Sequence, residues 1–144
     1  MNTQEWFQLV QSVASVATVV LVYFTWKQLS LVRKQAVTGF EDHLTEQYRR
    51  IVESIPIDVW LGSELKNLDK GRQELCRDAI FRYLDLCNEE AFLFEKKRVT
   101  DETWTEWKDG IRSNLGLPAF NEVWTEVREK SPKTFKELRK LVSS

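Results

Sequence analysis

Residues 6 to 26 have the sequence WFQLVQSVASVATVVLVYFTW, and this stretch decides how the rest of the chain is interpreted. It contains no Asp, Glu, Lys or Arg. At about 1.5 Å rise per residue its helix would be about 31 Å long, which is the thickness of a hydrocarbon core. Aromatic residues stand at both ends, as they do where a span meets the membrane interfaces. We therefore expect a transmembrane helix over residues 1–28.

Two other interpretations of this stretch stay open. A cleaved signal peptide needs a basic residue before its apolar region, and no Lys or Arg precedes Lys27. A buried helix of a water-soluble protein is the second alternative, because the stretch is less apolar than most spans. If the span is real, its flanks set its orientation: Lys27, Arg33 and Lys34 follow it, whereas Glu5 precedes it. This asymmetry predicts a cytoplasmic C-terminal domain and an N-terminus on the outer side.

Polar residues recur along one side of the expected span. A heptad seam, with alternating steps of four and three residues, contains Gln4, Gln8, Gln11, Ser15, Thr18, Val22, Thr25 and Leu29. A lone span would place three amides and several hydroxyls in hydrocarbon, where an amide without a partner costs several kcal/mol. Self-association removes that cost.

Two forms of association fit the seam. Two or three helices would form hydrogen bonds across it, whereas a larger ring would line a water-filled lumen in which Val22 is an apolar constriction. The alternative to association is that the Ser and Thr hydroxyls bond back to the preceding helical turn while the glutamines lie near the headgroups.

The remainder of the chain predicts a small all-helical domain. Apolar residues continue at helical spacing after the span, so we expect a stalk helix over residues 29–55 that Pro56 ends. Residues 56–144 are expected to form a cytoplasmic helical bundle packed on the stalk. The fold class predicted by the sequence is therefore all-α.

Residues that typically begin or end helices predict the individual helices of the bundle. They predict a short helix near residues 58–68, a long central helix over about 72–98, and helix starts at Thr100, Pro118 and Ser131. The central helix carries an apolar stripe that is expected to face the core: Leu75, Cys76, Ala79, Ile80, Tyr83, Leu84, Cys87, Ala91 and Phe94.

Composition gives few signs of chemistry. The 144 residues include 21 Lys+Arg and 22 Asp+Glu, so no long-range field favours nucleic acid. Cys76 and Cys87 lie eleven apart on one predicted helix, where they cannot bridge, and are expected as core residues in a reducing compartment. The chain has no Cys/His/carboxylate pattern of metal-ligand spacing and no phosphate loop, so we expect neither a metal nor another cofactor.

A cluster of three acidic residues on the predicted central helix has two interpretations. Asp85 and Glu89 lie one turn apart beside Arg82, and Glu90 adjoins them. If they were desolvated, these carboxylates would suit acid or base chemistry. The simpler interpretation is a solvated helix face with an intrahelical ion pair.

The same helix carries a family resemblance. Residues 81–92, FRYLDLCNEEAF, resemble the core helix of HEPN-type helical domains, whose ribonuclease members carry Arg, a polar residue, and His a few positions later. Arg82 fits this pattern, but Tyr83 replaces the polar neighbour and Asn88 stands where the family has His. Arg82 and Asn88 are therefore a degenerate HEPN-like pair. Without the imidazole the resemblance carries over no ribonuclease activity, and we expect no enzyme.

The whole layout also resembles a known class. One N-terminal span with a small HEPN-like bundle is similar to the membrane-pore accessory protein of type VI-B CRISPR systems and to small bacterial single-pass proteins. The resemblance implies the bacterial inner membrane and an oligomeric pore that acts in antiphage defence.

The sequence thus predicts a homo-oligomeric membrane pore or channel. Its expected partners are the lipid bilayer, further copies of the chain and a cytoplasmic protein. The first alternative is a membrane-tethered adaptor with no conducting path. A membrane-anchored ribonuclease centred on Arg82 and Asn88 is the second.

Overall fold

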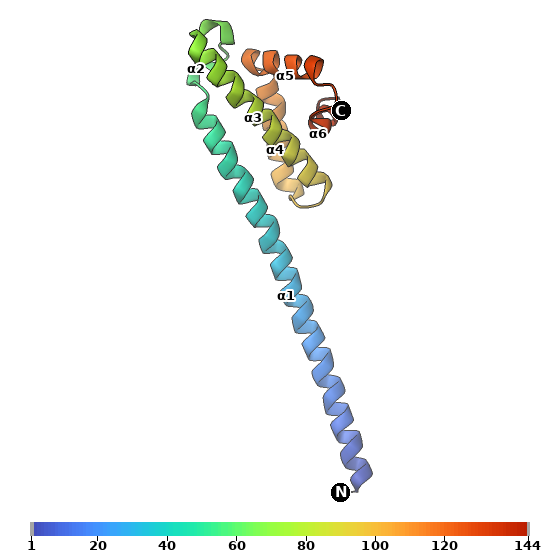
Figure 1. Cartoon of the computed structure of the whole chain (residues 1–144). Helices are drawn as coiled ribbons and strands as arrows, with labels where there is room; N and C mark the ends of the chain where they lie inside the picture. Colours follow the sequence, from blue (N-terminus) through green and yellow to red (C-terminus); the bar gives the residue numbers. More distant parts are fainter. Residues whose placement is uncertain (1, 144) are drawn as a thin grey trace. The chain divides into compact units, whose positions relative to one another are not determined.

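In this computed structural model the described residues are 2–143, without the side chains of residues 3, 5, 7, 9, 10 and 12–16. Across that range the chain forms helices and no strand, which confirms the predicted all-α fold (Figure 1). The elements are α1 (Thr3–Ser54), α2 (Ile57–Trp60), the short 3-10 helix η1 (Leu65–Asn67), α3 (Lys70–Glu95), α4 (Asp101–Leu115), α5 (Pro118–Lys130) and α6 (Lys136–Ser143).

The chain divides into two compact units, residues 1–36 and 37–144, and the boundary between them falls inside α1. The end of α1 at Ser54 confirms the prediction that Pro56 stops this helix. A proline pushes the residue before it out of the helical region of backbone space, so the helix ends just ahead of Ile55.

Helix α3 is the central element of the unit formed by residues 37–144, where it contacts α4, α5, α6 and η1. Its two cysteines are free and buried, which confirms their prediction as core residues. Leu75 was expected to face inward but is 69% exposed, because it lies at the edge of the buried face and Cys76 beside it is buried instead. The buried residues of α3 are Cys76, Ala79, Ile80, Tyr83, Leu84, Leu86, Cys87, Glu90, Ala91 and Leu93.

The part of α1 beyond residue 36 packs against this core. Leu44 and Ile55 are buried there. The Tyr48 ring lies with its centroid 6.3 Å from that of Tyr83. Near the start of α4, one Glu41 carboxylate oxygen accepts hydrogen bonds from the N–H and the hydroxyl of Thr100, at 2.8 and 2.9 Å. The last turns of α1 thus help to build the core of this unit.

Three helix starts follow local signals. Asp69 caps α3 by accepting a hydrogen bond from the Arg72 N–H at 3.1 Å, so that helix begins two residues before the predicted position. Thr100 caps α4, as predicted, by accepting from the Thr103 N–H. Pro118 is the first residue of α5, also as predicted, because proline has no N–H to leave unsatisfied there.

Two other helix predictions are wrong. The single short helix expected near residues 58–68 is two separate pieces, α2 and η1. The last helix begins later than the predicted start at Ser131. Its first turn is capped from α3, because the Asn88 side-chain oxygen accepts hydrogen bonds from the N–H groups of Glu137 and Leu138 at 3.0 and 3.3 Å. A tertiary contact, which local sequence does not reveal, therefore accompanies the start of α6.

Candidate functional site

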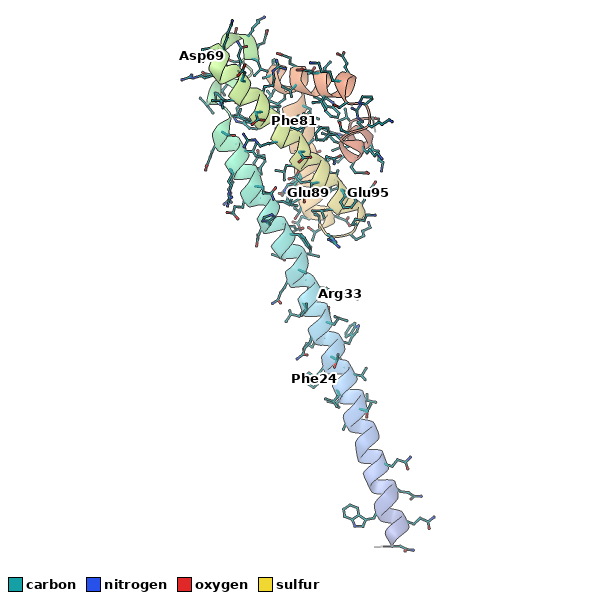
Figure 2. The ribbon with its side chains drawn as sticks, in the orientation of Figure 1. Phe24, Arg33, Asp69, Phe81, Glu89 and Glu95 are labelled. Carbon is teal, nitrogen blue, oxygen red and sulfur yellow. The ribbon has the colours of Figure 1, made fainter. Side chains whose placement is uncertain are left out.

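Large apolar side chains are exposed on every side of α1 over residues 19–32. Four consecutive residues, 19–22, are all exposed, and at 3.6 residues per turn they cover the full circumference of the helix. In Figure 2 the side chain of Phe24 projects outward from the helix. A helix that is apolar all round is typical of one enclosed by protein or by lipid. The exposed apolar residues here include Val19, Val20, Leu21, Val22, Tyr23, Phe24, Trp26, Leu29, Leu31 and Val32.

The seven positions predicted to line a pore or an oligomer face all lie on α1. Their spacing of four and three residues in a continuous helix places them along one side. The side chain of Ser15 lies outside the described residues, and the other six are exposed: Gln4, Gln8, Gln11, Thr18, Val22 and Thr25. The Thr25 hydroxyl donates a hydrogen bond to the Leu21 carbonyl at 2.8 Å, so at this position the back-bonding alternative is observed.

The basic flank of this stretch is exposed as well. Lys27, Arg33 and Lys34 all lie on the surface, and Figure 2 shows Arg33 projecting from α1. Among the residues that the structure describes, no helix combines the length and the apolar character needed to cross a membrane.

The degenerate HEPN-like pair is not brought together in one site. Arg82 forms an exposed ion pair with Asp78, one turn earlier on α3, at 2.8 Å. Asn88 has a different role, because its side-chain oxygen accepts hydrogen bonds from the first turn of α6. The ion pair is intrahelical, as the simpler interpretation expected, but its acid is Asp78 and not Asp85 or Glu89. Each member of the pair therefore has a structural role in a different place.

Among the three neighbouring acids on α3, only Glu90 is desolvated. Asp85 and Glu89 are exposed, whereas Glu90 is 6% exposed. Burial raises the pKa of Glu90 to about 8, with a smaller contribution from the negative charge of Glu89. The sequence carries a signal for this burial: Glu90 stands three residues after Cys87 and seven after Tyr83, both of which were predicted to face the core.

The described part of the chain contains no candidate metal-binding site. The Nε2 atom of the single histidine, His43, lies 2.7 Å from the side-chain nitrogen of Gln47, one turn further along α1. Within residues 2–143, no three His, Cys, Asp or Glu side chains gather in a way that would hold a metal ion.

No family model, no curated protein and no solved structure matches this chain. The HEPN-like resemblance and the pore therefore remain predictions.

Proposed function

We propose that the protein is a homo-oligomeric membrane pore or channel, in which the N-terminal part of α1 crosses the bilayer and the heptad seam faces the interior of the assembly. The observation that carries the proposal is the apolar surface that surrounds α1 over residues 19–32 while polar side chains follow one side of the same helix.

The exposed apolar side chains of α1 favour a covering surface. Eight Val, Leu and Phe side chains between residues 19 and 32 are 46–69% exposed. Burying one such side chain completely contributes about 1.5–3 kcal/mol, so enclosing what is exposed contributes on the order of 10 kcal/mol in total. That figure is comparable to the whole stability of a small domain, about 5–15 kcal/mol. Covering this helix with lipid or with a second protein surface would remove this exposure.

The arrangement of polar residues favours several copies over a lone span. In a ring, Gln11 and Thr18 would face water or the same residues of neighbouring copies, while Val20, about 180° away around the helix, would face lipid. Val22 lies between Thr18 and Thr25 on the seam, where a ring of apolar side chains would gate by dewetting. The basic residues after the span would remain on the cytoplasmic side.

A reconstitution experiment tests this proposal. The full-length protein is purified in detergent, its mass is measured, and it is placed in liposomes for ion-flux assays. We expect an oligomer that conducts. The double substitution Gln11→Leu with Thr18→Leu should abolish flux while the protein stays in the membrane, whereas the matched control Val20→Leu should conduct like the wild type. A monomer in detergent, or a wild-type protein that stays in the aqueous phase without detergent, would sink the proposal.

A membrane-tethered adaptor is the second candidate. It is favoured by large apolar side chains that are exposed in the unit formed by residues 37–144, among them Ile57, Leu61 and Leu75. Surfaces of this kind often bind partner proteins. Intact oligomers that carry no ion flux would favour the adaptor over the pore.

A further inference from the structure

A cavity of about 270 Å³ opens between the last turns of α1, the middle of α3 and the end of α4. All of its walls belong to the unit formed by residues 37–144. Tyr48 comes from α1, Tyr83 and Glu90 from α3, and Trp107 and Asn114 from α4. None of the residues that line the cavity is among those assigned to the pore, and the chemistry of the cavity differs from theirs.

Glu90 is the feature of this cavity that needs an explanation. Its side chain lines the cavity and is more than nine-tenths buried. Among the described residues its carboxyl group forms no hydrogen bond or ion pair, and its oxygens are not among the fully enclosed atoms that lack a partner, which are the indole nitrogens of Trp60 and Trp124, so they reach the space of the cavity. A buried carboxyl group without a partner is costly, and buried acids are normally paired or hydrogen-bonded. The missing partner is therefore expected to come from outside the chain.

The charged groups around Glu90 indicate whether that partner is a cation or an anion. The lining includes no Lys, Arg or His, and its second acid is Glu106 on α4. On α3 itself the ionisable groups that interact with Glu90 are Glu89, the buried thiol of Cys87 and the Tyr83 hydroxyl. Every ionisable group that faces Glu90 is thus acidic, so the cavity favours a cation.

Aromatic walls indicate that the cation is organic. The rings of Tyr48 and Tyr83 lie 6.3 Å apart, and Trp107 lines the same space. Burial raises the pKa of both tyrosines, so their hydroxyls stay neutral. Aromatic faces attract ammonium and guanidinium groups, and most strongly when water is excluded. A small metal ion would gain little from these rings.

Hydrogen bonding further restricts which organic cations the cavity would bind. A carboxylate accepts hydrogen bonds and donates none, so its best partner carries N–H groups. The Asn114 amide already donates to the Tyr83 hydroxyl at 2.9 Å, which fixes one wall of the cavity. We propose that this cavity binds a small organic cation with N–H donors, an alkylguanidinium or a primary alkylammonium, whose charged group pairs with Glu90 and whose chain lies against the aromatic rings.

The binding should depend on pH in a defined way. An acid that has a pKa of about 8 is mostly protonated at neutral pH, and only its ionised form pairs with a cation. Below that pKa, affinity should therefore rise about tenfold for each pH unit, because the competent fraction rises by that factor. Above it, affinity should level off. Glu106 on α4 and Glu89 on α3 both favour the bound cation and do not reverse this trend.

The test uses the full-length protein in detergent and three probes of similar size. Titration calorimetry, together with the total tryptophan fluorescence of the protein, measures the binding of n-butylguanidinium, n-butylammonium and the neutral control n-butanol. We expect saturable binding of at least one cation and none of the alcohol. Glu90→Gln should weaken binding by at least about tenfold at pH 8, because the amide carries no charge. Its matched control, Glu89→Gln, replaces an exposed acid on the same helix and should stay within about threefold of the wild type.

Several results would overturn the proposal. They are equal binding by Glu90→Gln and wild type, equal binding of butanol and the cations, or no saturable binding of either cation at pH 9. If Glu90→Gln does not fold, the wild type alone decides the question: an affinity for n-butylguanidinium that is the same at pH 6 and pH 8 rules out pairing with Glu90. Loss of ion flux in the pore assay has no bearing on these outcomes.

Discussion

Replacing Glu90 by glutamine should remove a large pH dependence of stability. The pKa of this carboxyl group is about 8 in the folded chain, against an ordinary value of 4.5 for glutamate. Between these values the unfolded chain has released the proton while the folded chain still holds it, so stability falls as pH rises and stays low above about 8. At about 1.4 kcal/mol for each unit of pKa, the wild type loses about 3–4 kcal/mol between pH 5 and pH 8. The amide does not ionise, so Glu90→Gln avoids this loss.

Thermal unfolding of the full-length protein in detergent, followed by circular dichroism at pH 5, 7, 8 and 9, measures the effect. One kcal/mol corresponds to about 4–8 °C in Tm for a domain of about 100 residues. The Tm of Glu90→Gln minus that of the wild type should therefore grow by more than about 10 °C from pH 5 to pH 8. Glu89→Gln, on the exposed side, should show a difference that hardly changes. A constant difference for Glu90→Gln across this range would refute the reasoning, since the carboxyl group would then have an ordinary pKa.

Two further substitutions test other assignments. Asn88→Ala removes the acceptor at the start of α6 and should lower the free energy of unfolding by about 1–2 kcal/mol in denaturant titrations, whereas Asn88→Asp keeps the acceptor and should cost less than about 0.5 kcal/mol. Equal losses would show that this side chain does not cap α6. Val22→Ser makes the proposed constriction polar and should raise ion flux through liposomes, whereas Val20→Ser, on the opposite side of the helix, should not. Unchanged flux in Val22→Ser would exclude a dewetted gate at that position.

The sequence predicted helix starts and ends correctly where interactions between neighbouring residues determine them. Thr100 caps α4 with its own side chain, Pro118 opens α5, and Pro56 ends α1, as the sequence predicts. Each of these signals acts within about four residues, through a side chain that satisfies a backbone group or a ring that restricts the backbone. The free, buried cysteines also follow from periodicity alone, because both stand on the apolar stripe of α3.

Contacts between distant segments account for what the sequence analysis missed. The start of α6 is capped by Asn88, nearly fifty residues earlier in the chain, so the local signal at Ser131 was misleading. Phe135 has a φ of 53°, in the left-handed region, directly before that helix, and nothing in its residue type indicates this. The partner of Arg82 was also missed, because the sequence offers acids on both sides of it at helical spacing and only packing selects Asp78.

The burial of Glu90 bears on function more than on folding. At pH 7 the folded chain keeps Glu90 protonated while the unfolded chain would ionise it, and this costs about 3 kcal/mol of stability, a large share of the roughly 5–15 kcal/mol that holds a small domain together. A buried acid that served only the fold would need an internal partner, because a carboxyl group without one is more costly than an apolar residue of the same size. The described residues supply none, and the cavity leads from this carboxyl group to solvent. A cation from outside the chain would both offset the cost of ionising Glu90 and occupy the aromatic walls beside it, so a single ligand explains two features that the fold alone does not require.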